Sequence, residues 1–243
     1  SSGRTRGGGP PSLRTGHYLG TDSRGWDVLA QIYGGLQLVF QAAFIYLGVT
    51  YAIGITLGSL MGYLGGAFDI VVQRLIEILA NVPFLYVVII IADRLGRDDV
   101  TLVTILLVLC IFSWIGITYY MRTAAYREKA RDYVAAARVL GAGPARVIFR
   151  HVLPNAVSIV VTLLPFSVVG VITALTALDF IGFGLPDKYP SWGRILQDGV
   201  TNLDYPWIVA SVFGGMVAVL LLVTFVGEAV REAFDPKKFT TYR

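Results

Sequence analysis

The side chains that most often perform chemistry are scarce in this sequence. It holds one cysteine and two histidines among 243 residues, so we expect neither a disulfide framework nor a zinc cluster. None of its lysines lies in the G-x-x-x-x-G-K-[ST] loop that cradles nucleotide phosphates, so the chain itself should bind no ATP by that route. A serine nucleophile paired with a histidine base is not evident either, which argues against an enzyme.

A few polar residues nevertheless interrupt apolar segments. Arg74 and Glu77 are three residues apart, so they share a helix face, and Asn81 and Pro83 follow them. Ionisable groups inside a membrane span are functional candidates, and we take Asn81, Pro83 and Asp179 as candidates for a translocation path. An interfacial ion pair is the alternative for Arg74 and Glu77, and a simple kink is the alternative for Pro83. Asp179 could meet an amine of a substrate, or it could be solvated by water.

The charged residues are distributed so unevenly that most of the chain must lie in a membrane. Hydrophobic residues make up 55% and charged residues only 15%, against about 25% charged in soluble domains. A helix needs about 20 mainly apolar residues to cross a bilayer, and long charge-free stretches recur along the sequence. We therefore predict an all-α, polytopic membrane helix bundle. Its five spans are expected at 36–62, 70–93, 100–121, 156–178 and 207–229.

The basic residues indicate the orientation, because they concentrate on the cytoplasmic side of membrane proteins. Segment 122–151 holds seven basic and two acidic residues, whereas acidic residues outnumber basic ones in 93–99 and 179–206. We predict 122–151 inside and the other two segments outside. Basic residues that lie between spans, and not along one soluble face, exclude a nucleic-acid binder.

The chain should contain three parts. Residues 1–35 are predicted to be a flexible external segment, 36–235 the transmembrane domain, and 236–243 a cytoplasmic tail. The first residue is Ser1, a glycine-rich stretch follows, and no signal-peptide pattern is present. We therefore expect a fragment or processed chain that lacks an upstream span.

Glycines recur every fourth residue in the first span. Gly54, Gly58 and Gly62 form a repeated G-x-x-x-G pattern, which lets helix backbones approach closely. We expect this face to pack against a partner permease or the missing helix, and a smooth pore wall is the alternative.

The basic segment 122–152 has the pattern of a helical hairpin. An alanine-rich run favours a short helix, Gly141 should end it, and Pro144 should begin a second helix that Pro154 closes. One interpretation is a basic amphipathic hairpin on anionic lipid head groups. The other is a protein-docking knob, because small alanine side chains at its tip suit insertion into another protein's groove.

This segment resembles the cytoplasmic signature loop of bacterial ABC importer permeases. The shared residues run from Tyr133 through three alanines to Gly141 and Ala142, followed by Ile148 and Leu-Pro-Asn at 153–155. Ala135 stands where the signature has glutamate. The sequence is further similar to the dipeptide and oligopeptide branch of these permeases, and most similar there to the microcin C and oligopeptide importer subunit. The stretches that carry this similarity are 20–29, 164–166, 178–186, 190–193 and 227–236.

The resemblance implies a type I permease of the bacterial inner membrane, which has one more span than we count here. Its partners would be a second permease, two ATPase subunits that bind ATP and magnesium, and an external solute-binding protein, with a peptide or peptide-like solute as substrate. The 179–206 loop would be a scoop-like, re-entrant segment, although its aromatic residues could instead be interfacial anchors. An ATP-independent channel or secondary transporter is the rival function. The residues expected to couple the permease to the ATPase are Ala135, Ala136, Ala137, Arg138, Leu140, Gly141 and Ala142.

Overall fold

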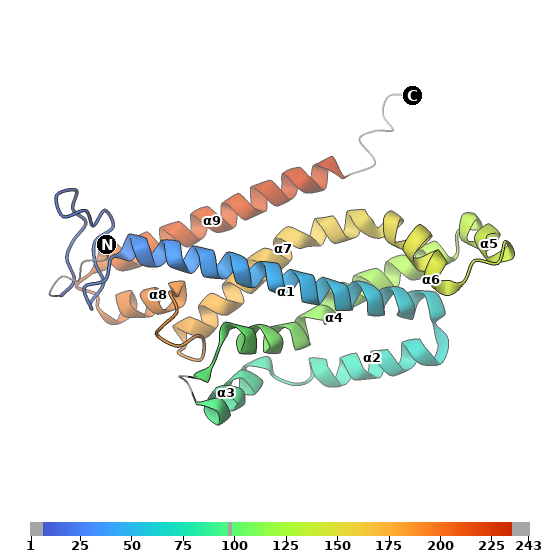
Figure 1. The fold of residues 1–243 in the computed structure, drawn as a ribbon, viewed down its shortest axis with the longest axis horizontal. Coiled ribbons are helices and arrows are strands. Elements are labelled where there is room, and N and C mark those ends of the chain that lie inside the picture. The colour runs from blue at the N-terminus through green and yellow to red at the C-terminus, as the bar shows by residue number, and fades with distance from the viewer. Residues whose placement is uncertain (1–6, 97–98, 235–243) are drawn as a thin grey trace. The chain divides into compact units, whose positions relative to one another are not determined.

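The computed structural model describes residues 7–96 and 99–234, and the regular elements in this part of the chain are helices (Figure 1). This agrees with the predicted all-α class. In chain order they are α1 (Val28–Leu64), α2 (Gly66–Ala80), α3 (Phe84–Leu95), α4 (Leu102–Lys129), α5 (Asp132–Val139), α6 (Pro144–Val147), the π-helix η2 (Ile148–Val152), α7 (Leu153–Phe180), α8 (Trp192–Thr201) and α9 (Pro206–Ala233).

Four helices are long and apolar enough to cross a membrane, namely α1, α4, α7 and α9. The first has 37 residues and the others 28 each. At about 1.5 Å per residue each exceeds the roughly 30 Å of a bilayer's hydrocarbon core. The four corresponding predictions are confirmed. However, α4 continues to Lys129, into the segment predicted to be loop.

The predicted span at 70–93 is not one helix. α2 and α3 are bent by 70° at the break between them, so the count of candidate spans is four, or five if the bent pair is one span. Asn81 ends α2, where its backbone N–H donates to the Ile78 and Leu79 carbonyls. Pro83 cannot donate a backbone hydrogen bond and disfavours helical geometry in the residue before it, which explains the break.

The chain divides into two compact units, and each of the four long helices has residues in both. Unit 1 comprises Ser1–Ile45, Val88–Leu106 and Val168–Phe225. Unit 2 comprises Tyr46–Val87, Leu107–Ser167 and Val226–Arg243. The described residues of the segments predicted to lie outside fall in unit 1, and the predicted inner loop falls in unit 2. This grouping agrees with the orientation expected from the charges.

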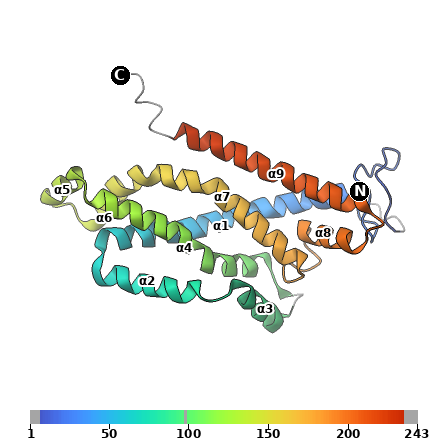
Figure 2. The ribbon, with the colours of Figure 1, turned by 180° about the vertical axis from the view of Figure 1, so that it is seen from behind.

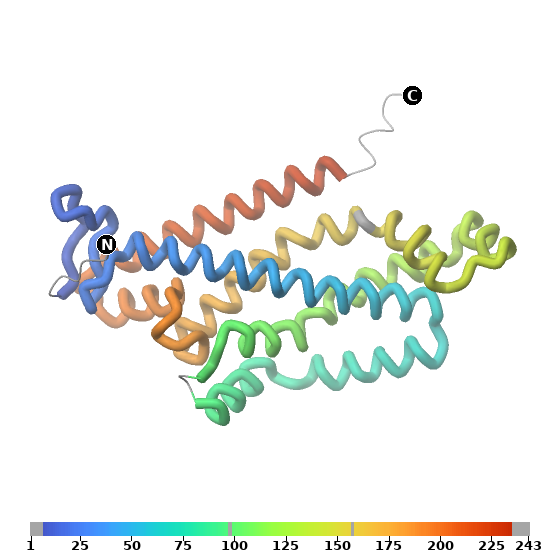
Figure 3. Tube along the Cα trace, in the orientation of Figure 1, coloured from blue at the N-terminus to red at the C-terminus, as the bar shows by residue number. Residues whose placement is uncertain are grey.

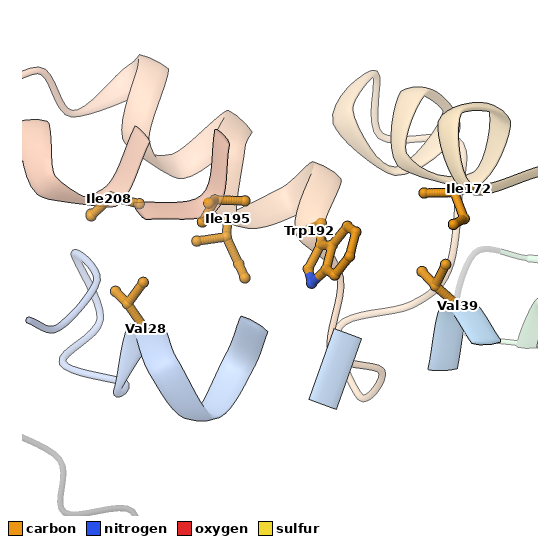
Figure 4. Close-up of a cluster of buried hydrophobic side chains, with 7 residues drawn as sticks. Val28, Val39, Ile172, Trp192, Ile195 and Ile208 are labelled. Carbon is orange, nitrogen blue, oxygen red and sulfur yellow. The ribbon is translucent and has the colours of Figure 1, made fainter. Parts of the chain in front are cut away.

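Unit 1 has an apolar core built around Trp192 at the start of α8 (Figure 4). The labelled side chains around it come from α1, α7, α8 and α9. The indole Nε1 of Trp192 donates to the Ile32 carbonyl at 2.9 Å, so this buried polar atom has a partner inside the core. The core joins the 179–206 loop to the first part of α1.

The segment that precedes α1 is more ordered than predicted. Ser23 donates from its hydroxyl and its backbone N–H to Asp198 on α8, at 2.5 and 3.1 Å. The Trp207 indole donates to the Thr21 carbonyl at 3.1 Å. Asp27 accepts from the Ala30 N–H at 2.9 Å, and this capping contact starts α1 at Val28 and not at residue 36. The predicted flexible segment therefore includes a part that is hydrogen-bonded to unit 1.

In unit 2 the repeated glycines of α1 pack against α4. A Cβ at Gly62 would lie 2.8 Å from the Ala125 Cβ, and one at Gly58 would lie 2.7 Å from the Met121 Cβ. Real Cβ atoms do not approach so closely, so only glycine permits this helix pair. The prediction of a close helix contact is confirmed, but the neighbour is α4 of the same chain, where we expected a partner permease or a missing helix.

A charge pair that the sequence did not indicate joins α2 to α4. Arg122 donates to both carboxylate oxygens of Asp69, at 2.6 Å each. Such two-pronged contacts fix orientation as well as contributing energy. Each of these two residues directly follows a charge-free stretch, and this position was the sequence feature that could have drawn attention to them.

Candidate functional site

The basic segment forms a helical turn between α4 and α7 (Figure 2). α5 follows α4 after a two-residue link, and α6, η2 and α7 then continue without a gap (Figure 3). The prediction of two short helices on either side of Gly141 is confirmed. The prediction that Pro154 closes the second helix is wrong: Pro154 is the second residue of α7, which continues from η2 without a gap, so the helix runs on through this proline.

Gly141 makes the turn through a left-handed backbone conformation, with φ of +82°. Its N–H donates to the Arg138 carbonyl, and the Ala142 N–H donates to the Ala137 carbonyl, both at 3.0 Å. This pair of hydrogen bonds is the Schellman motif, which satisfies the last carbonyls of a helix and favours glycine at this position. Nothing lies within 4 Å of a Cβ built on Gly141, so the need for glycine here is conformational and not steric.

One face of the turn is anchored in an apolar cluster. Val134 of α5 and Val147 of α6 are fully buried, together with Ile148 and Val152 of η2. Their neighbours include Tyr63 of α1 and Ala125 of α4. The turn is therefore packed onto two long helices of unit 2, and its geometry depends on them.

The tip of the turn presents apolar side chains to the outside. Val139 and Leu140 are 88% and 86% exposed. Of the predicted coupling residues, Ala135, Ala136, Arg138 and Gly141 are also exposed, whereas Ala137 and Ala142 are half-buried. Val139 was missed by sequence reasoning, which assigned the tip to the alanines. The exposed Val139 and Leu140 side chains, with Arg138 beside them, suit an apolar groove with an acidic edge on another protein.

A polar network lies at the base of the same turn. Glu128, near the end of α4, accepts a hydrogen bond from the Tyr133 hydroxyl of α5. That hydroxyl accepts from the Asn155 side chain of α7 at 3.0 Å, and the Asn155 amide also donates to the His151 carbonyl at 2.6 Å. Burial and the hydrogen bond to Glu128 raise the pKa of the Tyr133 hydroxyl above its ordinary value. No sequence pattern indicated this network beyond the presence of the residues.

The candidate path residues lie on the exposed side of α2 and in the break after it. Arg74 and Glu77 form an exposed ion pair at 2.5 Å, as their spacing predicted. The Asn81 amide donates to the Glu77 carbonyl at 2.7 Å, and both Asn81 and Pro83 are exposed. Gln73, one turn before Glu77, donates to the Tyr119 hydroxyl of α4 at 3.1 Å. Gln73, Arg74, Glu77 and Asn81 thus form a polar arc along α2. The other exposed side chains of this helix are mostly apolar.

Asp179 has a different role from either that we predicted. It is buried, and its two oxygens accept from the Leu185 N–H at 2.6 Å and from the Ser191 hydroxyl at 2.5 Å. Arg194 adds further ties within the loop, to the Leu185 carbonyl at 3.3 Å and to Asp187 at 2.7 Å. These contacts hold the irregular backbone of the 179–206 loop, so Asp179 is an anchor of the loop.

The 179–206 loop also contains a helix that the sequence did not indicate. α8 begins at Trp192, capped by the Ser191 side chain, and it buries Trp192 and Ile195 in the core of unit 1. Trp192 is therefore a core residue and not an interfacial anchor.

The sequence was compared with known protein families. Residues 54–240 match the family model described as "Binding-protein-dependent transport system inner membrane component". The chain belongs to this family. The match includes the whole helical turn and the 179–206 loop, and it confirms the resemblance to ABC importer permeases. With its long apolar helices, this permease is a multi-pass inner-membrane protein.

Individual relatives agree with the family. The chain is 41% identical over 222 residues to the peptidoglycan transport system permease protein YejE of Agrobacterium fabrum, covering 91% of this chain and 58% of that protein. It is 38% identical over 229 residues to the inner membrane ABC transporter permease protein YejE of Escherichia coli, covering 94% and 66%. It is 31% identical over 231 residues to the oligopeptide transport system permease protein OppC of Lactococcus lactis, covering 94% and 78%. The permease chain thus spans about three fifths to two thirds of the two YejE proteins.

The fold has a counterpart among solved structures. The inward-facing MetNI methionine ABC transporter matches with a TM-score of 0.63 at 17% identity, covering 85% of this permease and 95% of that chain. This likeness confirms the predicted importer-permease fold and carries no information about the substrate.

Proposed function

We propose that this permease forms part of the translocation path of an ATP-driven importer of peptides or peptide-like solutes, and that the α5–α6 turn receives the driving force. The observation that carries the proposal is the exposed Val139–Leu140 tip on a turn anchored to α1 and α4. The sequence has no phosphate-binding loop of its own. Energy from ATP must then enter through a contact with another subunit.

The proposed complex contains a second permease, two ATPase subunits that hold ATP and magnesium, and an external solute-binding protein. Family membership supports this composition, and the names of the YejE and OppC relatives support peptide-like substrates. A ligand shifts a conformational equilibrium only by its differential affinity for the two states. The ATPase must therefore bind the turn differently before and after hydrolysis.

A substitution at the tip tests the docking. Burying a leucine or valine side chain contributes about 1.5–3 kcal/mol, so the double variant Val139→Asp/Leu140→Asp should remove most ATPase subunits from the purified complex. Leu203→Asp is the matched control, because Leu203 is 78% exposed in the loop between α8 and α9. Undiminished recovery of the ATPase with the double variant would contradict docking at this tip. Solute uptake that persists without any ATPase would support a channel or secondary transporter.

The same proposal places the polar arc of α2 along the water-filled path. At 100° per residue, Gln73, Glu77 and Asn81 lie on one side of the exposed surface and Leu75 on another. Charged groups are costly in hydrocarbon, which supports contact of the Arg74–Glu77 pair with water. Asn81 and Pro83 would then border the path where α2 ends.

Cysteine labelling tests this placement, because removing Cys110 gives a chain without cysteine. In a Cys110→Ala background, Asn81→Cys should react with a membrane-impermeant thiol reagent, and the matched Leu75→Cys should not. Equal protection of both positions would contradict the path assignment.

A further inference from the structure

A buried carboxylate lies where the helical turn leaves the membrane-spanning helices. Glu128 is 7% exposed and is the one charged residue that is buried among the described residues of unit 2. An unpaired buried charge is costly, so its partners must compensate it. The arginines next to it are only loosely engaged: the Nε atoms of Arg127 and Arg131 are both 3.9 Å away, on side chains that are more than half exposed.

The direct partner of Glu128 is the Tyr133 hydroxyl, which also accepts from Asn155. This single hydroxyl therefore connects three helices: α4 through Glu128, its own α5, and α7 through Asn155. The Asn155 amide is fixed in turn by the His151 carbonyl, and the rings of Tyr133 and His151 lie 5.7 Å apart. Hydrogen bonds to a charged group are about twice as strong as neutral ones, and exposed ion pairs contribute little.

We propose that Glu128, Tyr133 and Asn155 form a positioning relay that converts movement of α5 into movement of α4 and α7. The proposal rests on the proposed function, because only a turn that is pushed by an ATPase needs such a connection. Ala135 stands where the signature loop has a glutamate. In this chain the carboxylate beside α5 comes from Glu128, at the end of the preceding helix.

The apolar cluster beneath the turn explains why hydrogen bonds are needed. Val134 packs α5 onto its neighbours, but apolar contacts are not directional. Two hydrogen bonds through one hydroxyl fix the rotation of α5 about its own axis. Without them α5 stays attached, but it transmits displacement poorly.

The relay is tested in the purified importer, reconstituted with its ATPase subunits and binding protein in vesicles. The probe is a tryptic digest of casein, and the measured quantities are peptide taken up per ATP hydrolysed and the amount of ATPase bound. Tyr133→Phe removes only the hydroxyl. Tyr126→Phe is the matched control, because Tyr126 is an exposed tyrosine of α4. Glu128→Gln keeps an acceptor for the hydroxyl and removes the charge.

Removing a hydrogen-bond donor from the buried Glu128 carboxylate shifts an equilibrium by roughly tenfold, so we expect about tenfold less uptake per ATP in Tyr133→Phe. ATPase binding and the peptide concentration for half-maximal uptake should not change. Asn155→Ala should resemble Tyr133→Phe, whereas Glu128→Gln and Tyr126→Phe should stay within about threefold of the unsubstituted complex. Normal coupling in Tyr133→Phe, or a loss in Tyr126→Phe of the same size, would overturn the relay alone. No peptide uptake or ATPase binding by the unsubstituted complex would overturn the proposed function as well.

Discussion

Replacing Gly141 by valine should uncouple the permease from ATP hydrolysis while leaving it in the membrane. The residue has φ of +82° and open space around its Cβ position. The penalty for valine is therefore backbone strain, which amounts to about 1–3 kcal/mol for a side-chain-bearing residue in this region. Since about 1.4 kcal/mol is a tenfold change in an equilibrium, roughly 2 kcal/mol would shift the equilibrium between the correctly folded and the distorted turn about thirtyfold toward the distorted one.

Two further variants separate strain from other effects at this turn. Gly141→Asn should retain most activity, because asparagine tolerates the left-handed conformation. Gly143→Val should be nearly neutral, since Gly143 has φ of −72° and ψ of 165°, a conformation open to any residue, and nothing lies within 4 Å of its Cβ position. The assay is ATP-dependent uptake in vesicles, with membrane insertion measured in parallel. Normal uptake with Gly141→Val, or equal damage from Gly143→Val, would refute this explanation.

Two other predictions concern stability. Gly62→Leu should lower the free energy of unfolding by about 1–3 kcal/mol, because it overpacks the α1–α4 contact. Gly48→Leu should not lower it, since nothing lies within 4 Å of a Cβ built on Gly48. Equal melting temperatures of the two variants in detergent would contradict this prediction. Asp179→Ala leaves the Leu185 N–H and the Ser191 hydroxyl without their acceptor, at about 1–3 kcal/mol. Limited proteolysis should then cut within 181–190, unlike in the exposed-site control Asp204→Ala, and an unchanged digestion pattern would argue against the anchor role.

The sequence was most informative where one local rule dominates. Charge-free stretches located the four long helices, because a bilayer penalises every charge in its interior. Gly141 and Pro144 located the turn and the following helix, because each has a backbone preference that few surroundings override. The Arg74–Glu77 pair followed from helical spacing alone.

Contacts between distant segments were not predictable in the same way. The glycines of α1 indicated a close helix neighbour but could not identify α4 among several candidates. The pairs Asp69–Arg122 and Tyr133–Asn155 depend on how helices pack, and no local pattern reports this. Asp179 was expected to meet a substrate amine or water, yet the loop folds back and buries it. The size of the bend between α2 and α3 likewise depends on packing, although Pro83 located it.

The most direct test of the proposed function is affinity purification of the tagged permease from gently solubilised membranes of its own host, with every co-purifying protein identified. The proposal predicts an ATPase that carries a phosphate-binding loop, together with a second permease. Recovery of this chain alone, stable and monodisperse, would contradict ATP-driven import and would assign the α5–α6 turn to the lipid surface.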